Sequence, residues 1–442
     1  MPFPRIRRRR VLLFLSIMGP GIITASVDQD AGGIATYSLA GAHYGTSLLW
    51  SLFFITISLA VVQEMGSRMG VVTGKGLAEL IREVYGLRVT AAVMVVLVLA
   101  NWANTVAEFA GVAAALEIFG VPRLLSVPVV AGLVACLIVQ GTYRLVERAF
   151  LLASAVYVVY VISGILARPA WGEVLRATVT PTFQLETGYL TMLIALVGTT
   201  IAPWMQFYLQ SSVVDKGIRV KEYPFVRLDV FLGSLVAAVI AFFIIVACAA
   251  TLSVHGVRIE TAADAARALE PFAGRYATAL FAVGLFNASA FAAAIVPLST
   301  AYAVCEALGW VSGVDRALHE APGFFAIYLA LVASGAAAIL WPGAPLIEIM
   351  VASQVLNGIL WLYQWILIAR AVVSWVSADP RNPIVQFLLM ATEPVIRVVR
   401  RLLPTSLRYF PLDIAFLVVF GLVVFLQYGI VPSLVDLGLK LR

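Results

Sequence analysis

The chain has 442 residues, of which 62% are hydrophobic and 12% charged, and its mean hydropathy is +0.98. A soluble domain is about half apolar and about one quarter charged, so this composition excludes a soluble globular protein. Apolar windows of about 20 residues recur from end to end, which predicts a multi-pass, all-α membrane protein. In that setting the net charge of +6 reports membrane orientation and predicts no nucleic-acid partner. Three widely spaced cysteines indicate neither a disulfide framework nor a thiolate metal site.

Hydropathy predicts a series of spanning helices, of which the first and the sixth are broken near mid-span. Boundaries obtained in this way are accurate to about four residues. The predicted helices are 11–42, 46–66, 89–113, 124–141, 149–167, 187–213, 230–252, 275–305, 323–341, 345–374 and 410–434.

Basic residues mark one side of the membrane. The tail 1–10 is rich in arginine, and the loops expected on the same side carry further Lys and Arg residues. Because cytoplasmic loops hold such an excess, we expect a cytoplasmic N-terminus in the cell inner (plasma) membrane. The loop residues concerned are Arg68, Lys75, Arg82, Arg88, Arg144, Arg148, Lys216, Arg219, Lys221 and Arg227.

The first predicted helix carries acids at its centre. Within GPGIITASVDQDAGGIATYSLAG, Asp28 and Asp30 precede the pair Gly32 and Gly33. A carboxylate at membrane depth costs about 2.5–3.5 kcal/mol, so it normally faces a cavity or a partner. Adjacent glycines weaken a helix and free backbone carbonyls. The pattern is typical of a midplane cation site in a transporter, and a glycine kink with a paired acid is the alternative.

The sixth predicted helix is interrupted at a corresponding position. Gly198, Thr199 and Thr200 are followed by Pro203, which lacks an amide donor and blocks a carbonyl. A lone proline kink is common in membrane helices and is the alternative interpretation. Interruptions at matching positions of two five-helix halves indicate an inverted-repeat transporter.

The third predicted helix carries a polar stripe. Asn101, Asn104, Thr105 and Glu108 follow the i, i+3, i+4, i+7 spacing of one helix face. Such a stripe faces either a bundle interior with hydrogen bonds between helices or a water path. Both interpretations remain open on the sequence.

Several segments resemble the Nramp family of divalent-metal transporters. They are GPG at 19–21, DAGG at 30–33, AGAHYGTSLLW at 40–50, VVTGKGLAELIREVYG at 71–86, AEFAG at 107–111, GTTIAP in the sixth helix and Ser353-Gln354-Val355 in the tenth. The resemblance covers about residues 11–370 and implies a LeuT-like 5+5 inverted repeat with a metal site between the broken first and sixth helices. We assign 11–355 to this transporter core, with the tenth helix continuing to 374.

The family's ligand pattern is only partly present. The resemblance implies that Asp30 is the main metal ligand, whereas Gly33 and Ala202 stand where the family has an asparagine and a methionine. Backbone carbonyls near Val27 and Thr199 are implied to complete the site. Auxiliary or gating roles are implied for Asp28, Glu108, Thr105, Trp204 and Gln354, with Trp204 replacing a histidine and Thr105 replacing one of two acids.

These substitutions change the chemistry expected of the site. A thioether favours transition metals over hard ions, and here it is missing together with the asparagine side chain. Mg²⁺ gives up water reluctantly and is usually bound through one or two carboxylates. A roomier, oxygen-only site therefore suits partly hydrated Mg²⁺, and the pattern resembles the Nramp-related magnesium transporter branch. Loss of the histidine and of one acid predicts Mg²⁺ and Mn²⁺ transport without proton coupling and without a cofactor.

The C-terminal end resembles a different family. The segments ARAVVSW, DPRNP at 379–383 and TEPVIRVVRRLLP at 392–404 are similar to the YggT family of small bacterial membrane proteins. We assign 356–435 to this segment, which overlaps the tenth helix and adds about one spanning helix, and 436–442 to a tail. Residues 384–402 form a basic amphipathic stretch that is expected to bind anionic lipid, and a solvated basic linker is the alternative.

Other functions remain open on the sequence alone. A proton-coupled Mn²⁺/Fe²⁺ transporter is the nearest alternative, and a non-transporting membrane scaffold or sensor is the alternative from another class. An organic-cation or amino-acid transporter on the same fold is less favoured because Asp30 and the metal-family motifs are kept. An enzyme is not expected, since the sequence holds no His/Glu metal-ligand spacing, phosphate-binding loop or nucleophile constellation. The expected partners are a divalent metal ion and the lipid bilayer, and no protein partner is predicted.

Overall fold

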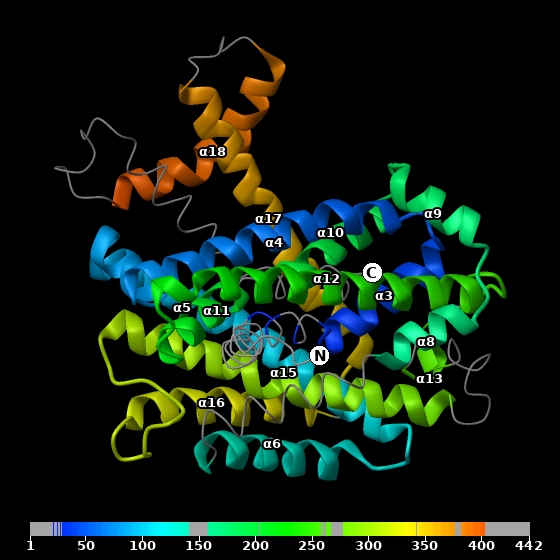
Figure 1. The fold of residues 1–442 in the computed structure, drawn as a ribbon, viewed down its shortest axis with the longest axis horizontal. Coiled ribbons are helices and arrows are strands. Elements are labelled where there is room, and N and C mark those ends of the chain that lie inside the picture. Colours follow the sequence, from blue (N-terminus) through cyan, green and yellow to red (C-terminus); the bar gives the residue numbers. More distant parts are fainter. Residues whose placement is uncertain are drawn as a thin grey trace, which may run out of the picture.

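The computed structural model describes residues 21, 24, 27, 29–140, 158–202, 204–257, 259, 262–266, 277–341, 343–375 and 382–402, which are almost entirely helical (Figure 1). Seven helical stretches in this part of the chain are long and apolar enough to span a membrane. The prediction of an all-α, multi-pass membrane protein is confirmed.

Most of the long helices run roughly side by side in one bundle (Figure 1). The elements in chain order are α3 (Ala31–Tyr44), α4 (Leu49–Thr73), α5 (Leu77–Glu117), α6 (Arg123–Gln140), α8 (Val158–Leu166), α9 (Trp171–Val179), α10 (Thr187–Thr200), α11 (Trp204–Asp215), η2 (Val220–Glu222), α12 (Tyr223–Cys248), η3 (Ala249–Ser253), α13 (Ala262–Ala266), α15 (Ala277–Leu308), α16 (Pro322–Ile339), α17 (Leu346–Trp375) and α18 (Pro383–Leu402).

Both predicted helix breaks are present. The chain bends at Asp30 before α3 begins at Ala31. The second break separates the end of α10 at Thr200 from the start of α11 at Trp204. α3 contacts α10, so the helix that follows the first break packs against the helix that precedes the second.

Two elements differ from the hydropathy prediction. α5 begins at Leu77 instead of 89, because its first turns are too charged to score as a spanning window. Gly86, at φ 77° and ψ 172°, turns the chain between these turns and the apolar part of α5, which glycine does without steric cost. α9 is missing from the prediction because its nine residues are too few for such a window. The first half of the helix predicted at 11–42, part of that at 149–167 and the helix at 410–434 lie outside the described residues.

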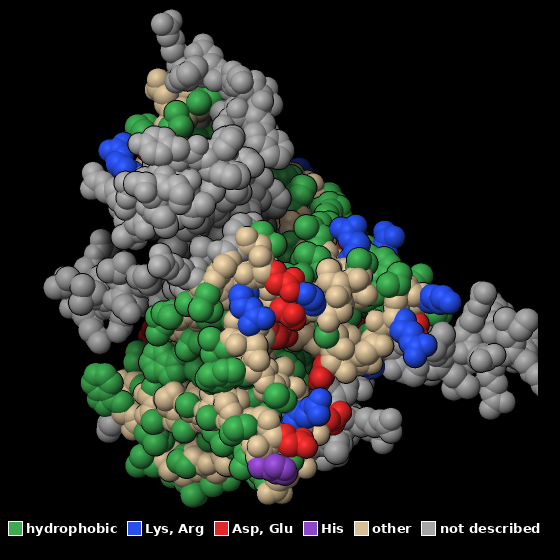
Figure 2. All heavy atoms as spheres, turned by 90° about the vertical axis from the view of Figure 1, so that its left-hand side faces the viewer, with side chains coloured by type: hydrophobic (Ala, Val, Ile, Leu, Met, Phe, Trp, Pro, Cys, Tyr) green, Lys and Arg blue, Asp and Glu red, His purple; other side chains and the backbone are tan. Residues whose placement is uncertain are grey.

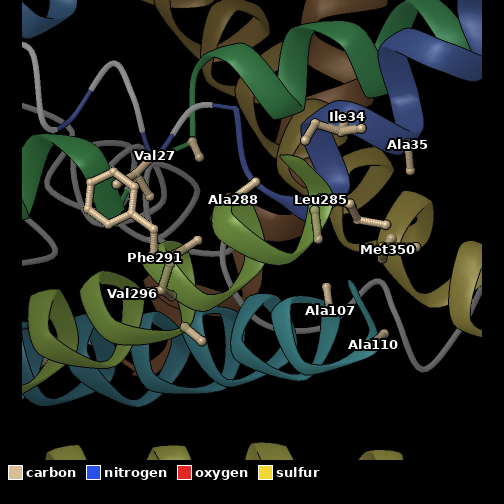
Figure 3. Packing of buried hydrophobic residues seen from close by; sticks show 14 of the residues in the cluster. Val27, Ile34, Ala35, Ala107, Ala110, Leu285, Ala288, Phe291, Val296 and Met350 are labelled. Atoms are coloured by element: carbon tan, nitrogen blue, oxygen red, sulfur yellow. The ribbon is translucent and has the colours of Figure 1, made fainter. Parts of the chain in front are cut away.

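Small residues bring α3, α5 and α15 into close contact at the centre of the bundle. A Cβ at Gly111 of α5 would lie 2.4 Å from the Cβ of Ala31, so glycine at this position lets the first turn of α3 reach α5. Figure 3 shows the surrounding apolar cluster, in which Val27 lies close to Phe291 of α15. This packing places the start of α3 against Gly111, which lies one helical turn from Glu108 along α5.

Polar contacts close one end of the bundle. Ser211 of α11 donates a hydrogen bond to Glu306 Oε1 of α15 at 2.5 Å, and the Glu306 carboxylate lies against Gly76 at the start of α5. Gln210 Nε2 donates to the backbone oxygen of Lys75 at 2.8 Å. Figure 2 views the molecule from this side, where Lys and Arg side chains lie among Asp and Glu side chains. The α4–α5 turn, α11 and α15 are thereby tied together.

The last described helices extend away from the bundle. The second half of α17 leaves the bundle, and α18 packs against α17 (Figure 1). Within α18, Leu388, Thr392 and Ile396 are buried at four-residue intervals, whereas Met390 and Arg397 are exposed. The predicted amphipathic stretch at 384–402 is therefore an amphipathic helix.

Candidate metal centre

The first break directs the N-terminus of α3 at two carboxylates. Asp30 is the N-cap residue, and the Gly33 N–H donates to Asp30 Oδ1 at 2.5 Å. The Ala31 N–H donates to Glu108 Oε2 of α5 at 3.1 Å. First-turn amides lack partners within their own helix and favour negative charge. The break therefore holds both acids at one point in the centre of the bundle.

The two acids interact with each other and are shielded from solvent. The exposed fraction is 4% for Asp30 and 0% for Glu108. Glu108 Oε1 has no hydrogen-bond partner in the described part of the chain. Neighbouring carboxylates in a poorly solvated interior repel each other unless a cation or a proton lies with them. The pair is therefore suited to a divalent cation.

Side chains of α17 extend the polar region next to Asp30. Gln354 interacts with Asp30, and a Cβ at Gly32 would lie 2.0 Å from Gln354 Nε2, so glycine leaves room for this amide. Asn357 Nδ2 donates to Gln354 Oε1 at 3.2 Å and to Asn104 Oδ1 of α5 at 3.4 Å. We call the five buried residues of this region the polar cluster: Asp30, Asn104, Glu108, Gln354 and Asn357.

A hydroxyl pair joins α3 to the end of α10, directly before the second break. Tyr37 Oη of α3 lies 2.8 Å from Thr200 Oγ1 at the end of α10. The neighbouring Thr199 is buried, and its Oγ1 has no partner in the described residues. The Thr199 carbonyl also lacks its helical partner, because Pro203, four residues on, has no N–H. Thr199 thus brings two oxygens to the second break.

The remaining predicted residues of the second break face other helices. The Ala202 carbonyl accepts a hydrogen bond from the Met205 N–H at 3.2 Å. Trp204 is buried, and its backbone oxygen accepts from Ser299 Oγ of α15 at 3.0 Å. The Met205 sulfur accepts from Gln63 Nε2 of α4 at 3.6 Å. The thioether next to the break is therefore occupied on the α4 side.

The predicted polar stripe of α5 contacts several helices and does not line one cavity. Asn101 Nδ2 donates to Thr300 Oγ1 of α15 at 2.7 Å. Thr105 Oγ1 donates to the Asn101 backbone oxygen at 2.6 Å, and its methyl group lies near Gly335 of α16. Only Asn104 and Glu108 of the stripe belong to the polar cluster. The hydrogen bonds from Asn101 and Asn104 to other helices agree with the interpretation as a bundle interior, and the water path stays a prediction.

Three further predicted positions surround Asp30. Val27 is fully buried in the apolar cluster beside Phe291 (Figure 3). Gly33 contributes its backbone N–H to the Asp30 carboxylate and offers no side-chain ligand. Asp28 lies outside the described residues.

The sequence does not identify Asn357 as a member of the site, and Asn104 is not among the predicted site residues. The signal for Asn357 is its spacing from Gln354, since two amides at i and i+3 share one face of an otherwise apolar helix. No residue pattern indicates that this face meets α3 and α5 at the break. That contact depends on the tertiary packing.

The donors gathered here are oxygens and amides. Among the described residues, no group of three or more His, Cys, Asp and Glu side chains could hold a metal ion. The polar cluster and Thr199 instead offer two carboxylates, amide oxygens, a hydroxyl and a backbone carbonyl. Hard cations such as Mg²⁺ and Mn²⁺ prefer such ligands.

A small, mainly apolar pocket lies beside α3 beyond Asp30. Its walls include Ile34 and Ala35 of α3, Leu285 of α15 and Met350 of α17, all labelled in Figure 3. Ile34 is one turn from Asp30. The polar cluster is therefore separated from this pocket by about one layer of apolar side chains.

Comparison with solved structures identifies the architecture. The manganese transporter of Eremococcus coleocola, in complex with an aromatic bis-isothiourea substituted compound, superposes with a TM-score of 0.64 at 19% identity, over 100% of this chain and 96% of that one. Mhp1, a nucleobase-cation-symport-1 family transporter, superposes with a TM-score of 0.56 at 13% identity, over 96% of this chain and 93% of that one. The LeuT-like fold implied by the family resemblance is confirmed.

Sequence comparison identifies the family. The divalent metal cation transporter MntH of Deinococcus radiodurans is 31% identical over 304 residues, which cover 65% of this chain and 67% of that protein. The MntH protein of Verminephrobacter eiseniae is 28% identical over 348 residues, which cover 73% and 76% respectively. Residues 349–434 match the CCB3/YggT family. Residues 21–373 match the family described as natural resistance-associated macrophage protein-like, and the chain therefore belongs to the Nramp family.

Proposed function

We propose that the protein carries divalent metal ions across the membrane by alternating access, with Mg²⁺ as the main substrate and Mn²⁺ as a second one. The observation that supports this most strongly is the buried pair Asp30 and Glu108 at the N-terminus of α3. Two carboxylates that meet at a helix break inside a spanning bundle form a site for a cation at membrane depth. Family membership and the MntH relatives support the same substrate class.

The donor chemistry supports the preference for Mg²⁺. Gly33 and Ala202 contribute no side-chain donor, and the Met205 sulfur is engaged by Gln63 on α4. A site without a soft ligand gives transition metals little advantage over hard ions. An ion held by two carboxylates, a carbonyl and retained water molecules matches the coordination that Mg²⁺ usually adopts in proteins.

The same residues support transport without proton coupling. Trp204 and Thr105, which stand where the family has a histidine and an acid, have no group that titrates near neutral pH. Thr105 is hydrogen-bonded to the Asn101 backbone oxygen and lies near α16, away from Asp30. Glu108 is then the one side chain of the polar cluster besides Asp30 that can take up a proton.

Alternating access requires each side of the site to open in turn. Ser211 and Gln210 of α11 bind Glu306 and the Lys75 backbone at one end of the bundle. Towards the other end, Ile34 and Met350 lie between the polar cluster and the apolar pocket. We propose that release of the Glu306 contacts opens the site to the cytoplasm, and that separation of the apolar layer opens it to the outside.

The arrangement of charge supports the proposed orientation in the inner (plasma) membrane, with a cytoplasmic N-terminus. Lys75 lies in the α4–α5 turn, and Lys216, Arg219 and Lys221 follow directly after α11, the helix that carries Ser211. Cytoplasmic loops are enriched in such residues. The same side is therefore proposed to be cytoplasmic.

The C-terminal segment, which we place at 356–435, is proposed to contact anionic lipid through α18. Arg397 is exposed on this helix, while Leu388 and Ile396 lie on its buried face. The full-length protein in nanodiscs with phosphatidylglycerol should show slower hydrogen exchange over 383–402 than in nanodiscs of phosphatidylcholine alone. Arg397→Glu should remove part of that difference. Equal exchange in both lipids would leave the basic helix without a lipid partner.

One observation favours the proton-coupled Mn²⁺/Fe²⁺ transporter as the second candidate. Asp30 and Glu108 interact directly, and neighbouring acids can hold one proton between them. A metal ion that displaces this proton would couple metal transport to proton transport. A scaffold or sensor, by contrast, would show no ion flux at all.

Transport by the purified chain separates these functions. The protein is reconstituted in liposomes that contain indicators for Mg²⁺, Mn²⁺ and pH, and Asp30→Asn serves as the inactive control. Mg²⁺ and Mn²⁺ entry without acidification supports the leading proposal, and metal-dependent acidification supports the second. Absence of any ion entry above the control would support the scaffold or sensor.

A further inference from the structure

Two asparagines lie beside the predicted ligands without belonging to them. Asn357 of α17 and Asn104 of α5 have exposed fractions of 1% and 3%. Asn357 Nδ2 donates to Asn104 Oδ1 at 3.4 Å and to Gln354 Oε1 at 3.2 Å. These two contacts use the NH₂ group of Asn357 and hold its side chain between α5 and α17.

The asparagines continue directly to the carboxylates. Gln354 interacts with Asp30, Asp30 interacts with Glu108, and Asn104 precedes Glu108 by one turn of α5. The polar cluster is thus a series of side-chain contacts across α3, α5 and α17 whose two ends, Asn104 and Glu108, lie one turn apart on α5. A ligand bound at the two acids lies next to the amides of α17.

Three atoms of the polar cluster are buried without a partner in the described residues: Glu108 Oε1, Gln354 Nε2 and Asn357 Oδ1. Buried polar atoms are nearly always hydrogen-bonded to protein, water or ligand. Two of these three atoms are oxygens: an amide oxygen, which can only accept a hydrogen bond, and a carboxyl oxygen, which accepts when the group is ionised. The cluster therefore has unused acceptors next to its negative charge.

Unused acceptors match a cation that keeps some of its water. A water molecule on a divalent ion directs its lone pair at the metal, so towards the protein it acts as a hydrogen-bond donor. Mg²⁺ usually keeps several water molecules when bound, whereas ions that lose water more readily depend less on such acceptors. The Asn357 amide oxygen is buried in the cluster that holds both acids.

We propose that Asn357, held by Asn104 and Gln354, is a specificity-determining residue whose Oδ1 accepts a hydrogen bond from water bound to the transported ion. This inference rests on the proposed transport function and adds to it the residue that favours a hydrated ion. Asn357 does not bind the metal directly. Its oxygen stabilises the hydrated ion beside Asp30 and Glu108.

The test compares ion selectivity among full-length variants in liposomes. Asn357→Leu removes the acceptor while keeping a side chain of similar size, and Asn357→Asp keeps an oxygen at the same place. Asn101→Leu is the matched control, because Asn101 is a buried asparagine that binds Thr300 outside the polar cluster. Initial rates of Mg²⁺ and Mn²⁺ entry are measured for each.

Asn357→Leu should lower Mg²⁺ entry about tenfold, as expected for loss of one hydrogen bond to a charged group, and Mn²⁺ entry distinctly less. Asn357→Asp should retain Mg²⁺ entry, and Asn101→Leu should leave the Mg²⁺/Mn²⁺ ratio unchanged. If the leucine variant does not fold, Asn357→Val removes the same oxygen with less volume and takes its place.

Each failure has its own signature. If the parent protein moves neither ion, the proposed function is wrong. If the parent transports but the apolar variants keep its Mg²⁺/Mn²⁺ ratio, or lose both ions equally, the role of Asn357 is wrong and the proposed function stands.

Discussion

The hydroxyl of Tyr37 lies 2.8 Å from the hydroxyl of Thr200, and this contact joins the helix that follows the first break to the helix that precedes the second. Thr200 also donates to the Leu196 backbone oxygen at 3.0 Å, so Tyr37 is the donor in the pair. With Thr200 acting as acceptor, the contact fixes the end of α10, which also carries Thr199, against α3. This hydrogen bond adds a specific polar contact to the packing between the two halves of the proposed metal site.

Tyr37→Phe removes the hydroxyl that makes this contact. The variant should lose about 1 kcal/mol of stability, the usual net value of a buried hydrogen bond, and its Mg²⁺ entry should fall because Thr199 is held less firmly. The matched control is Tyr160→Phe, since the buried Tyr160 hydroxyl has no hydrogen-bond partner in the described residues. Thermal unfolding and liposome flux check both effects. If the two variants had the same thermal stability and the same Mg²⁺ flux, the proposed role of the Tyr37 contact would be wrong.

Much of the fold could be predicted from the sequence, because the membrane makes hydropathy an unusually direct signal. The breaks at Asp30 and before Trp204 follow from a charge, two glycines and a proline inside apolar runs. The start of α5 could not be predicted in the same way. Its first turns are amphipathic, and only packing against α15 distinguishes them from a loop.

The candidate site could be predicted only in part. Asp30 can be recognised because a carboxylate at membrane depth is costly unless it faces a cavity or a partner. Glu108 can be recognised because it lies on a polar stripe. The sequence does not indicate that Thr105 faces α16 while Asn104 faces α17, since both residues belong to the same stripe. Their different surroundings arise from the positions of the neighbouring helices, which local spacing does not encode.

Glu306 should matter for the stability of the end of the bundle that we propose to be cytoplasmic. Glu306→Ala leaves Ser211 and the start of α5 without their common partner, which should cost about 1–3 kcal/mol. The neighbouring Cys305 is fully buried, so its thiol should react faster with maleimide in this variant. The control is Glu83→Ala, which removes an exposed ion pair with Lys75 worth about 0–1 kcal/mol. Unchanged Cys305 labelling in Glu306→Ala would contradict a closing role.

Restoring the family's ligands should change the selectivity. In the double variant Gly33→Asn, Ala202→Met, an amide and a thioether are added and the site loses volume. Because a soft donor favours transition metals, Mg²⁺ entry should fall while Cd²⁺ and Mn²⁺ binding improves. Isothermal titration and liposome flux measure the two quantities. A double variant that keeps the parent's Mg²⁺ preference would rule out the explanation based on a hydrated ion.

Metal transport should proceed without proton movement. Mg²⁺ entry into liposomes should leave the internal pH unchanged, and an inward proton gradient should not accelerate it, because Trp204 and Thr105 cannot carry protons. A pH indicator inside the liposomes records the first effect and a pH jump outside tests the second. Acidification that scales with metal flux and disappears in Glu108→Gln would favour the proton-coupled alternative.

The measurement that tests the account most directly is divalent-ion flux through Asp30→Asn. Asparagine also serves as an N-cap residue, so α3 should keep its start and the variant should fold, while the charge of the main proposed ligand is lost. Asp28→Asn is the comparison and should reduce flux only partly. We expect Mg²⁺ and Mn²⁺ to enter liposomes that contain folded Asp30→Asn no faster than they enter empty liposomes. Mg²⁺ entry at the parental rate through this variant would contradict it.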